Sequence, residues 1–284
     1  MVFPLSLLRQ HAQDSIADLP ALKDAATKAA AHILHGVHGQ KKAGGSETFW
    51  QFREYTDSDR PQDIDWRQSG KTEHIYVREK ELQTPQSIYF WANLSASMDF
   101  QSDTALHSKL EASQILSLAL AMLFRRGEER IGVLGQNRVG NSEDALDRIG
   151  RALLSTDDNS LPDGKTPSNS SAILCSDFLD DPNEIEAAFT SLAGKNVRGI
   201  IIQILDPAEL KLPYDGHHIF HDTSRADHKI DNVASIRDAY QDKIAAHLKA
   251  VEALTHAYGF SYTLHVGDQP LEETLTRIWE GEQR

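Results

Sequence analysis

The chain has 284 residues, a net charge of −13 and a pI near 5.4. This acidic balance argues against nucleic acid as a partner, because binding to its phosphates needs clustered Lys and Arg. The longest apolar stretch, ILSLALAMLF, is too short to span a bilayer, and the N-terminus lacks the basic and apolar regions of a signal peptide. We therefore predict a cytoplasmic protein without membrane insertion.

The predicted elements divide the chain into three parts. Residues 1–38 form an N-terminal helical segment, with a short helix over 18–38. Residues 39–85 are rich in charged and aromatic residues, and alternating runs such as TFWQFREY indicate a β-rich extension. Residues 86–284 alternate apolar strand patterns with helical patterns. This last part is predicted to be the main domain.

The alternation in the main domain predicts an α/β fold. Strands are expected in SIYFWANL, RIGVLGQ, AILCSDF, RGIIIQIL and FSYTLHV. Helices are expected in KLEASQILSLALAMLFRRG, NSEDALDRIGRALL (capped by Asn141 or Ser142), PNEIEAAFTSLA, residues 232–258 and from Leu271 onward. Such an order is typical of a mostly parallel sheet with helices on both faces, whose ligand sites lie at the carboxyl ends of the strands.

Several suggestive motifs are better explained without a function. The turns Ser69–Thr72 and Asp163–Thr166 end like a phosphate-binding P-loop but lack the glycine five positions before the Gly-Lys pair. The single cysteine, Cys175, excludes an intramolecular disulfide and fits a small buried hydrophobe. Two histidine clusters are attributed to chance rather than to metal binding: His32, His35 and His38, and His217, His218 and His221.

The stretch NLSAS is the main candidate for a site. Ser95 and Ser97 follow the first buried strand, and Asp177 follows a later one. Two hydroxyls and a carboxylate at neighbouring strand ends could surround Mg²⁺ or Mn²⁺, which prefer oxygen ligands. Alternatively, the serines cap the next helix and Asp177 caps the helix after its own strand. The spacing does not choose between these two interpretations.

The segment FREYTDSDRPQDIDWRQSGKT is the second candidate. It is dense in Arg, Asp, Tyr and Trp. Such a segment can hold itself together by ion pairs and aromatic packing, or it can present a surface to a partner. Exposed ion pairs contribute little stability each, so stability alone does not require so many charges. Both interpretations stay open at this point.

In combination, these motifs resemble a known bacterial family. The blocks are GGSETFWQFREY, DIDWRQS, VREKE, the strand leading into SASM, EERIGVLG, LCSDFLDDP and QILDPAELKLPYDG. They are similar to a von Willebrand factor A-like family of the domain-of-unknown-function type, whose members are encoded beside MoxR-type AAA+ ATPases. The resemblance runs from about residue 35 to residue 275.

The resemblance implies a fold and a metal site. The fold is a Rossmann-like von Willebrand factor A domain with a small β-rich N-terminal extension. In that superfamily the serines of a D-x-S-x-S loop bind a divalent cation, together with a threonine from another loop. Here Ser95, Ser97 and Asp177 match, Asn93 replaces the first Asp, and neither Thr156 nor Thr166 has the usual context. The resemblance thus implies a degenerate site at Asn93, Ser95, Ser97 and Asp177, with Mg²⁺ or Mn²⁺ bound weakly or not at all.

The resemblance also implies a function. We expect a non-enzymatic interaction module, an adaptor or co-chaperone of a MoxR-type AAA+ ATPase. The partner would bind to the serine loop itself or to the extension, where the candidate residues are Arg53, Tyr55, Asp65, Trp66 and Arg67.

The alternative function is a metal-dependent hydrolase of the phosphoesterase kind. It would use the same strand-end cleft, with Asp99, Asp103 and Asp177 around a metal-bound water. Asn93 counts against this alternative, as does the lack of a His or Lys at a motif-defined position to serve as acid or base.

Overall fold

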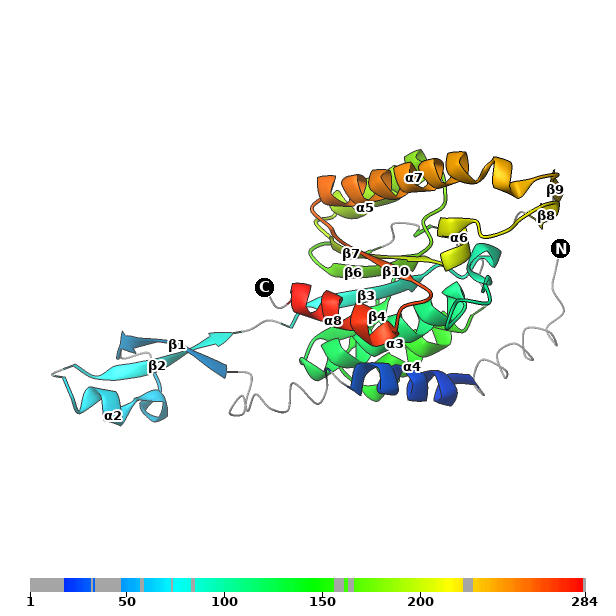
Figure 1. Cartoon of the computed structure of the whole chain (residues 1–284). Helices are drawn as coiled ribbons and strands as arrows, with labels where there is room; N and C mark the ends of the chain where they lie inside the picture. The colour runs from blue at the N-terminus through cyan, green and yellow to red at the C-terminus, as the bar shows by residue number, and fades with distance from the viewer. Residues whose placement is uncertain are drawn as a thin grey trace. The chain divides into compact units, whose positions relative to one another are not determined.

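The chain divides into two compact units in the computed structural model of Figure 1. The structure describes residues 18–31, 33, 47–56, 59–72, 74–82, 85–155, 161–162, 166–221 and 227–282. The smaller unit comprises Val37–Pro85. The larger unit combines Met1–Gly36 with Gln86–Arg284.

The smaller unit is built on an antiparallel hairpin. Strand β1 (Glu47–Glu54) pairs with β2 (Tyr76–Leu82), and the connection carries the short helices η1 (Pro61–Asp63) and α2 (Trp66–Ser69). Ile64 forms a bridge to Val77, whose side chain is buried. Both strands lie within the segment that was predicted to be β-rich.

A six-stranded sheet forms the centre of the larger unit. Its strands are β3 (Ser87–Ala92), β4 (Arg130–Val133), β5 (Val139–Gly140), β6 (Ser171–Ser176), β7 (Arg198–Leu205) and β10 (Ser261–Val266). They lie in the order β10-β7-β6-β3-β4-β5, and all neighbours are parallel except β4 and β5. The first strand of this sheet along the chain, β3, lies in its middle. The strands β4 and β5 are then added on one side of β3, and β6, β7 and β10 on the other, so the switch point lies between β3 and β6. Doubly wound sheets bind their ligands at the carboxyl ends of the strands beside such a switch point.

Helices cover both faces of this sheet (Figure 1). On one face, the helix over residues 18–31 packs with α3 (Lys109–Arg126), α4 (Glu143–Leu153) and α8 (Leu271–Glu282). On the other face lie α5 (Pro182–Ala193) and α7 (Arg237–Ala257). The predicted mostly parallel sheet flanked by helices is confirmed.

Burial explains why these segments form these elements. All six residues of β6 are buried, as a continuous apolar run in a central parallel strand requires. Helix α3 is apolar on more than one side because it packs against the sheet, α4 and α8. Ser142 caps α4 by accepting a hydrogen bond from the Ala145 backbone N–H. Of the two residues predicted as the cap, Asn141 and Ser142, it is therefore Ser142 that caps the helix. Cys175 is fully buried, as predicted.

The short elements were not predicted. They include β5, helix α6 (Pro207–Lys211), the 3₁₀ turns η2 (Ala96–Met98) and η3 (Val233–Ser235), and the hairpin of β8 (His218–His221) with β9 (Asp227–Ile230). The helix predicted from residue 232 begins instead at Arg237, because η3 precedes it. Segments this short carry too few residues for a hydrophobic period to be read.

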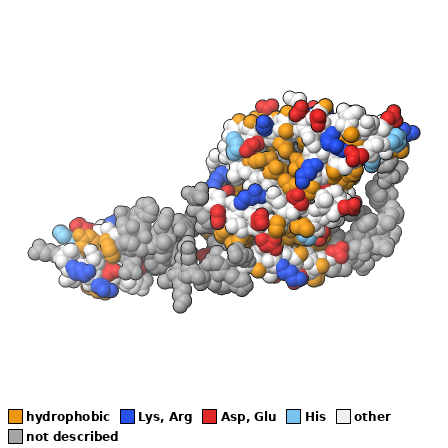
Figure 2. All heavy atoms as spheres, in the orientation of Figure 1, with side chains coloured by type: hydrophobic (Ala, Val, Ile, Leu, Met, Phe, Trp, Pro, Cys, Tyr) orange, Lys and Arg blue, Asp and Glu red, His pale blue; other side chains and the backbone are white. Residues whose placement is uncertain are grey.

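The edge of the sheet at β10 is only partly covered. Figure 2 shows hydrophobic side chains gathered between α7 and β10. Leu254, Tyr258 and Tyr262 are partly buried and pack against the core under α5 and α7.

Within the described part of the chain, no helix combines the length and apolar character needed to cross a membrane.

Candidate functional site

Asn93 begins the turn that follows β3, and it is buried, with 1% of its surface exposed. Its backbone N–H donates to the carbonyl of Cys175 on β6 at 2.8 Å. Its Oδ1 accepts from the Ser95 backbone N–H at 2.8 Å, and its Nδ2 donates to Ser176 Oγ at 3.0 Å. Both ends of the Asn93 amide are therefore occupied by hydrogen bonds within the protein.

Ser95 and Ser97 face each other in the same turn. Their Oγ atoms are 3.0 Å apart. Ser95 precedes η2 but its side chain does not cap that turn. Helix α3 starts only at Lys109 and is capped by Ser108, and α5 is capped by Asp181. The interpretation of Ser95, Ser97 and Asp177 as helix caps is thus wrong, because residues between each of them and the next helix supply the cap.

Asp177 follows β6 and is buried beside β3, with 1% of its surface exposed. Its Oδ2 accepts a hydrogen bond from Lys109 Nζ at 3.0 Å. Ser176 Oγ lies 3.4 Å from Asp177 Oδ1 and so links this carboxylate to Asn93. Gln203 Nε2 donates to the Asp177 backbone carbonyl at 2.7 Å. The fold brings all four predicted residues into one hydrogen-bonded network at the ends of β3 and β6.

Lys109 was not predicted to take part in this site. Its side chain is 2% exposed, and its Nζ also lies 2.5 Å from Glu209 Oε1. Glu209 belongs to a capping box at the start of α6, in which its Oε2 accepts from the Asp206 backbone N–H. Burial raises the pKa of the Glu209 carboxyl, although the nearby Lys109 ammonium acts in the opposite direction. The sequence signal for Glu209 was the capping-box pattern DPAE.

These side chains do not fit a divalent metal ion. Mg²⁺ gives up its waters reluctantly and favours charged oxygen ligands. Among the four predicted ligands, Asn93 is neutral and both ends of its amide are hydrogen-bonded within the protein, while the Asp177 carboxylate is paired with Lys109. Thr166 is buried, and its Oγ1 has no hydrogen-bond partner among the described residues; Thr156 lies outside them. The described residues contain no group of three His, Cys, Asp or Glu side chains placed to hold a metal.

The other candidate ligands do not join the network. Asp99 and Asp103, which the hydrolase alternative requires beside Asp177, are exposed, whereas Asp177 is buried. His217 and His218 lie at β8, and no metal group forms around them among the described residues. The other cluster (His32, His35 and His38) and most of the turn Asp163–Thr166 lie outside the described residues.

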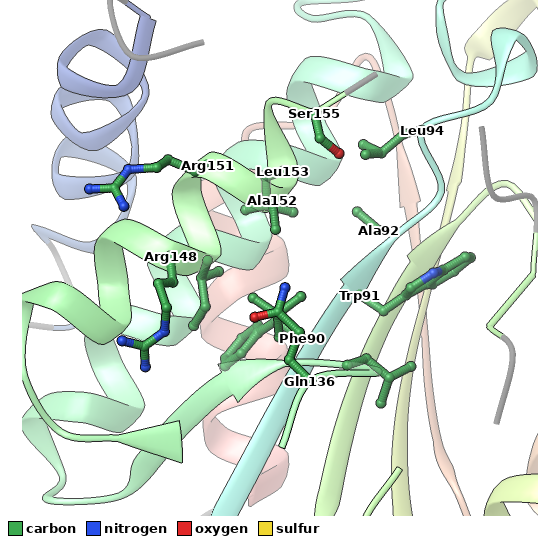
Figure 3. A pocket seen from close by; sticks show the side chains of 13 residues that line it. Phe90, Trp91, Ala92, Leu94, Gln136, Arg148, Arg151, Ala152, Leu153 and Ser155 are labelled. Carbon is green, nitrogen blue, oxygen red and sulfur yellow. The ribbon is translucent and has the colours of Figure 1, made fainter. Parts of the chain in front are cut away.

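A cavity of about 410 Å³ lies next to the site, between α4 and the carboxyl ends of β3 and β4. Phe90, Ala92 and Leu94 line it from β3 and the turn after it. Arg148 and Ser155 line it from the side of α4, and Ser155 and Leu94 lie close together at one end (Figure 3). The lining of this cavity combines apolar side chains with the two basic side chains Arg148 and Arg151.

The loop between η2 and α3 is fastened to the carboxyl edge of the sheet. The Ser102 backbone N–H donates to Asp206 Oδ2 at 2.8 Å, and the Leu106 backbone N–H donates to the Gly267 carbonyl at 2.8 Å. Three large apolar side chains nevertheless remain exposed in the loops after β3 and β6. They are Phe100 at 37%, Leu106 at 57% and Leu179 at 38%.

In the smaller unit, the five predicted partner-binding residues have different surroundings. Arg53 forms a two-pronged ion pair with Asp59, with N–O distances of 2.7 and 3.0 Å. Asp65 caps α2 by accepting from the Gln68 backbone N–H. Arg53 and Asp65 therefore stabilise the unit itself, whatever else they do. Tyr55 is half-buried and Arg67 is exposed. Trp66 is 68% exposed, more than Phe52 at 37% and Ile75 at 46%, the other exposed large apolar side chains among the described residues of this unit.

Comparisons with known proteins identify relatives of unknown function. The family model "Protein of unknown function DUF58" matches residues 51–250, which is more than half of the chain. Uncharacterized proteins from Mycobacterium bovis and Mycobacterium tuberculosis are each 26% identical over 275 residues, covering 87% of this chain and 84% of the relative. The crystal structure of the conserved hypothetical protein BatB from Bacteroides thetaiotaomicron is similar at 12% identity and a TM-score of 0.41, covering 70% of this chain and 98% of that chain.

Proposed function

The chain belongs to the DUF58 family, and on that premise we propose that it is a protein-interaction module without catalytic activity. In this proposal it is a cytoplasmic adaptor or co-chaperone of a MoxR-type AAA+ ATPase, and its larger unit is a von Willebrand factor A-like domain. The strand order of the sheet and the serine turn after the central strand β3 support that domain assignment. The motif resemblance of the sequence supports the ATPase as the partner.

The observation that carries the proposal is the character of the carboxyl edge. Its polar groups are engaged with one another: Asn93 with Ser95 and Ser176, and Asp177 with Lys109. A catalytic site needs a base, acid or nucleophile held ready for a substrate. This edge displays exposed apolar side chains around a polar network that is mostly hydrogen-bonded within the protein, although Asp180 Oδ2 is buried without a partner among the described residues. Exposed apolar side chains of this kind are typical of protein-binding surfaces.

We infer that the ATPase contacts the carboxyl edge, with Leu106 and Leu179 at the contact. Leu106 projects from a loop that is fixed by hydrogen bonds at both Ser102 and its own backbone N–H. A rigid apolar anchor loses little conformational entropy on binding, so it contributes efficiently to affinity. The exposed Trp66 of the smaller unit is the other candidate anchor.

The test is a binding titration between the purified full chain and a MoxR-type ATPase. We expect Leu106→Ser with Leu179→Ser to weaken binding by about tenfold or more, since a central anchor contributes at least about 1.4 kcal/mol. The matched control is Ile219→Ser on β8, where the side chain is 44% exposed; it should leave binding unchanged.

Other results would contradict the proposal in distinguishable ways. A loss of binding with Trp66→Ala but not with the two leucine variants would move the contact to the smaller unit. Trp66→Ala is preferred to an Arg53 variant, because Arg53 holds Asp59 in place. Absence of binding between the unmodified chain and the ATPase would refute the adaptor function itself.

A further inference from the structure

One buried lysine and two carboxylates meet at the carboxyl edge of the sheet. Asp177 at the end of β6 and Glu209 in α6 both point a carboxylate oxygen at Lys109 Nζ, at 3.0 and 2.5 Å. The three residues come from three different elements. Lys109 therefore ties the start of α3 to the end of β6 and to the start of α6.

Lys109 occupies an unfavourable place for a lysine. It is the first residue of α3, where the backbone N–H groups give the helix end a partial positive charge that repels cations. The residue is also only 3% exposed, and removing an ammonium from water is strongly unfavourable unless it is paired. The helix dipole and the loss of hydration both oppose this arrangement. The two carboxylates are what hold the ammonium there.

The Lys109 ammonium and the neutral side chain of Asn93 both disfavour a divalent cation at this site. Asn93 brings no negative charge to the turn, and its amide is occupied by Ser95 and Ser176. Lys109 adds a positive charge next to Asp177, the one carboxylate among the four predicted ligands. A divalent cation would have to displace the ammonium or accept it as a close neighbour of like charge.

We propose that Lys109 is a built-in cation that pairs with Asp177 and Glu209 at the carboxyl edge in place of a divalent metal ion, and that it keeps metal ions out of this site. The proposal goes beyond the adaptor function and does not depend on the identity of the partner. It also differs from the simpler explanation that Asn93 alone weakens metal binding. In that simpler explanation, restoring an aspartate at position 93 restores the metal site.

The experiment is a calorimetric titration of Mn²⁺ into the full-length chain, with thermal unfolding measured in Mn²⁺ and in EDTA. Four proteins are compared: the unmodified chain, Asn93→Asp, Lys109→Gln, and the double variant Asn93→Asp/Lys109→Gln. Glutamine removes the charge but can still donate hydrogen bonds to the neighbouring carboxylates, so it disturbs the fold less than an apolar residue. We expect Mn²⁺ to bind the double variant at least about tenfold more tightly than Asn93→Asp, and to raise only the double variant's melting temperature clearly.

A third substitution identifies where the metal binds. The acidic chain can take up Mn²⁺ elsewhere on its surface, so the double variant is also tested with Asp177→Asn added. Binding that persists in this triple variant does not involve the predicted site, and that outcome contradicts the proposal.

Three further outcomes would overturn it. One is equal Mn²⁺ affinity of the unmodified chain and the double variant. Another is Asn93→Asp binding as tightly as the double variant, since Asn93 alone would then explain the loss of metal. The third is a double variant that does not bind Mn²⁺ and, if unfolded, does not fold when Mn²⁺ is added. According to the proposal, Mn²⁺ should take the place of the missing Lys109 ammonium beside Asp177.

Discussion

The buried pair of Lys109 and Asp177 gives the sharpest test of the energetics at the site. The perturbation is Lys109→Met, which keeps the length of the side chain but removes its charge. It leaves the Asp177 carboxylate without a cation at a position that is 1% exposed, and it removes the same cation from Glu209, whose side chain is 18% exposed. Breaking a buried ion pair from one side destabilises a protein by about 3–5 kcal/mol. That is a large part of the roughly 5–15 kcal/mol by which a domain is stable.

A second substitution, Asp177→Asn, tests this argument, because its effect on the free energy of unfolding should have opposite signs with and without Lys109. In the unmodified chain, Asp177→Asn removes one charge-assisted hydrogen bond, but Lys109 keeps Glu209 as a partner. We expect it to lower the free energy of unfolding by about 2 kcal/mol. In the Lys109→Met background the same substitution removes the more deeply buried of the two carboxylates that have lost their cation. We therefore expect Asp177→Asn to stabilise that background rather than destabilise it.

The assay is urea unfolding followed by far-ultraviolet circular dichroism. Its signal comes mainly from the larger unit, which contains the long helices α3 and α7. The matched control is Arg138→Met, because Arg138 pairs with Asp144 at 3.3 Å on the surface, with side chains 72% and 56% exposed. An exposed pair contributes at most about 1 kcal/mol. If Asp177→Asn destabilised both backgrounds equally, the two residues would not be coupled and the charge argument would be refuted.

Two further predictions concern the packing of the larger unit. Burial lowers the pKa of His265, whose Nδ1 lies 2.9 Å from Thr274 Oγ1, from 6.5 to about 4. The unfolded chain therefore binds one more proton in this range, and stability should fall by about 3 kcal/mol as the pH falls between 6.5 and about 4. Urea unfolding across this range should show a smaller fall for His265→Asn, and an unchanged fall would contradict the assignment. Gly199→Ala should destabilise by about 1–3 kcal/mol, because its new Cβ would lie 2.6–2.9 Å from ring atoms of Phe260. In the same unfolding assay Gly281→Ala, with nothing within 4 Å of its Cβ, should cause no loss; equal losses would argue against the steric explanation.

The order of the main elements could be predicted from local patterns. The strand β6 follows from a continuous apolar run, and the start of α4 follows from Ser142 before an acidic first turn. These signals are local because a strand or helix displays its period within a few residues, and a cap acts on the next turn. The hairpin of β8 and β9 escaped prediction because each of its strands has only four residues.

The site could be predicted only in part. The turn of Asn93, Ser95 and Ser97 and the strand end at Asp177 follow from two short stretches and from the rule that parallel strands end at one edge. The capping interpretation of the same residues failed because the loop between η2 and α3, and the residues before α5, insert other caps. The residues after a strand do not by themselves show where the next helix begins, so they do not show which residue caps it.

The sequence by itself determined the α/β class, the long elements, the acidic charge and the chemical nature of the turn after β3. Only the tertiary structure decided that Asp177 shares a buried cation with Glu209. Lys109 lies 68 residues before Asp177 and 100 residues before Glu209. No local period or cap connects residues so far apart. They meet because the order of the strands places the start of α3, the end of β6 and the start of α6 at one edge of the sheet, where burial makes an ion pair necessary.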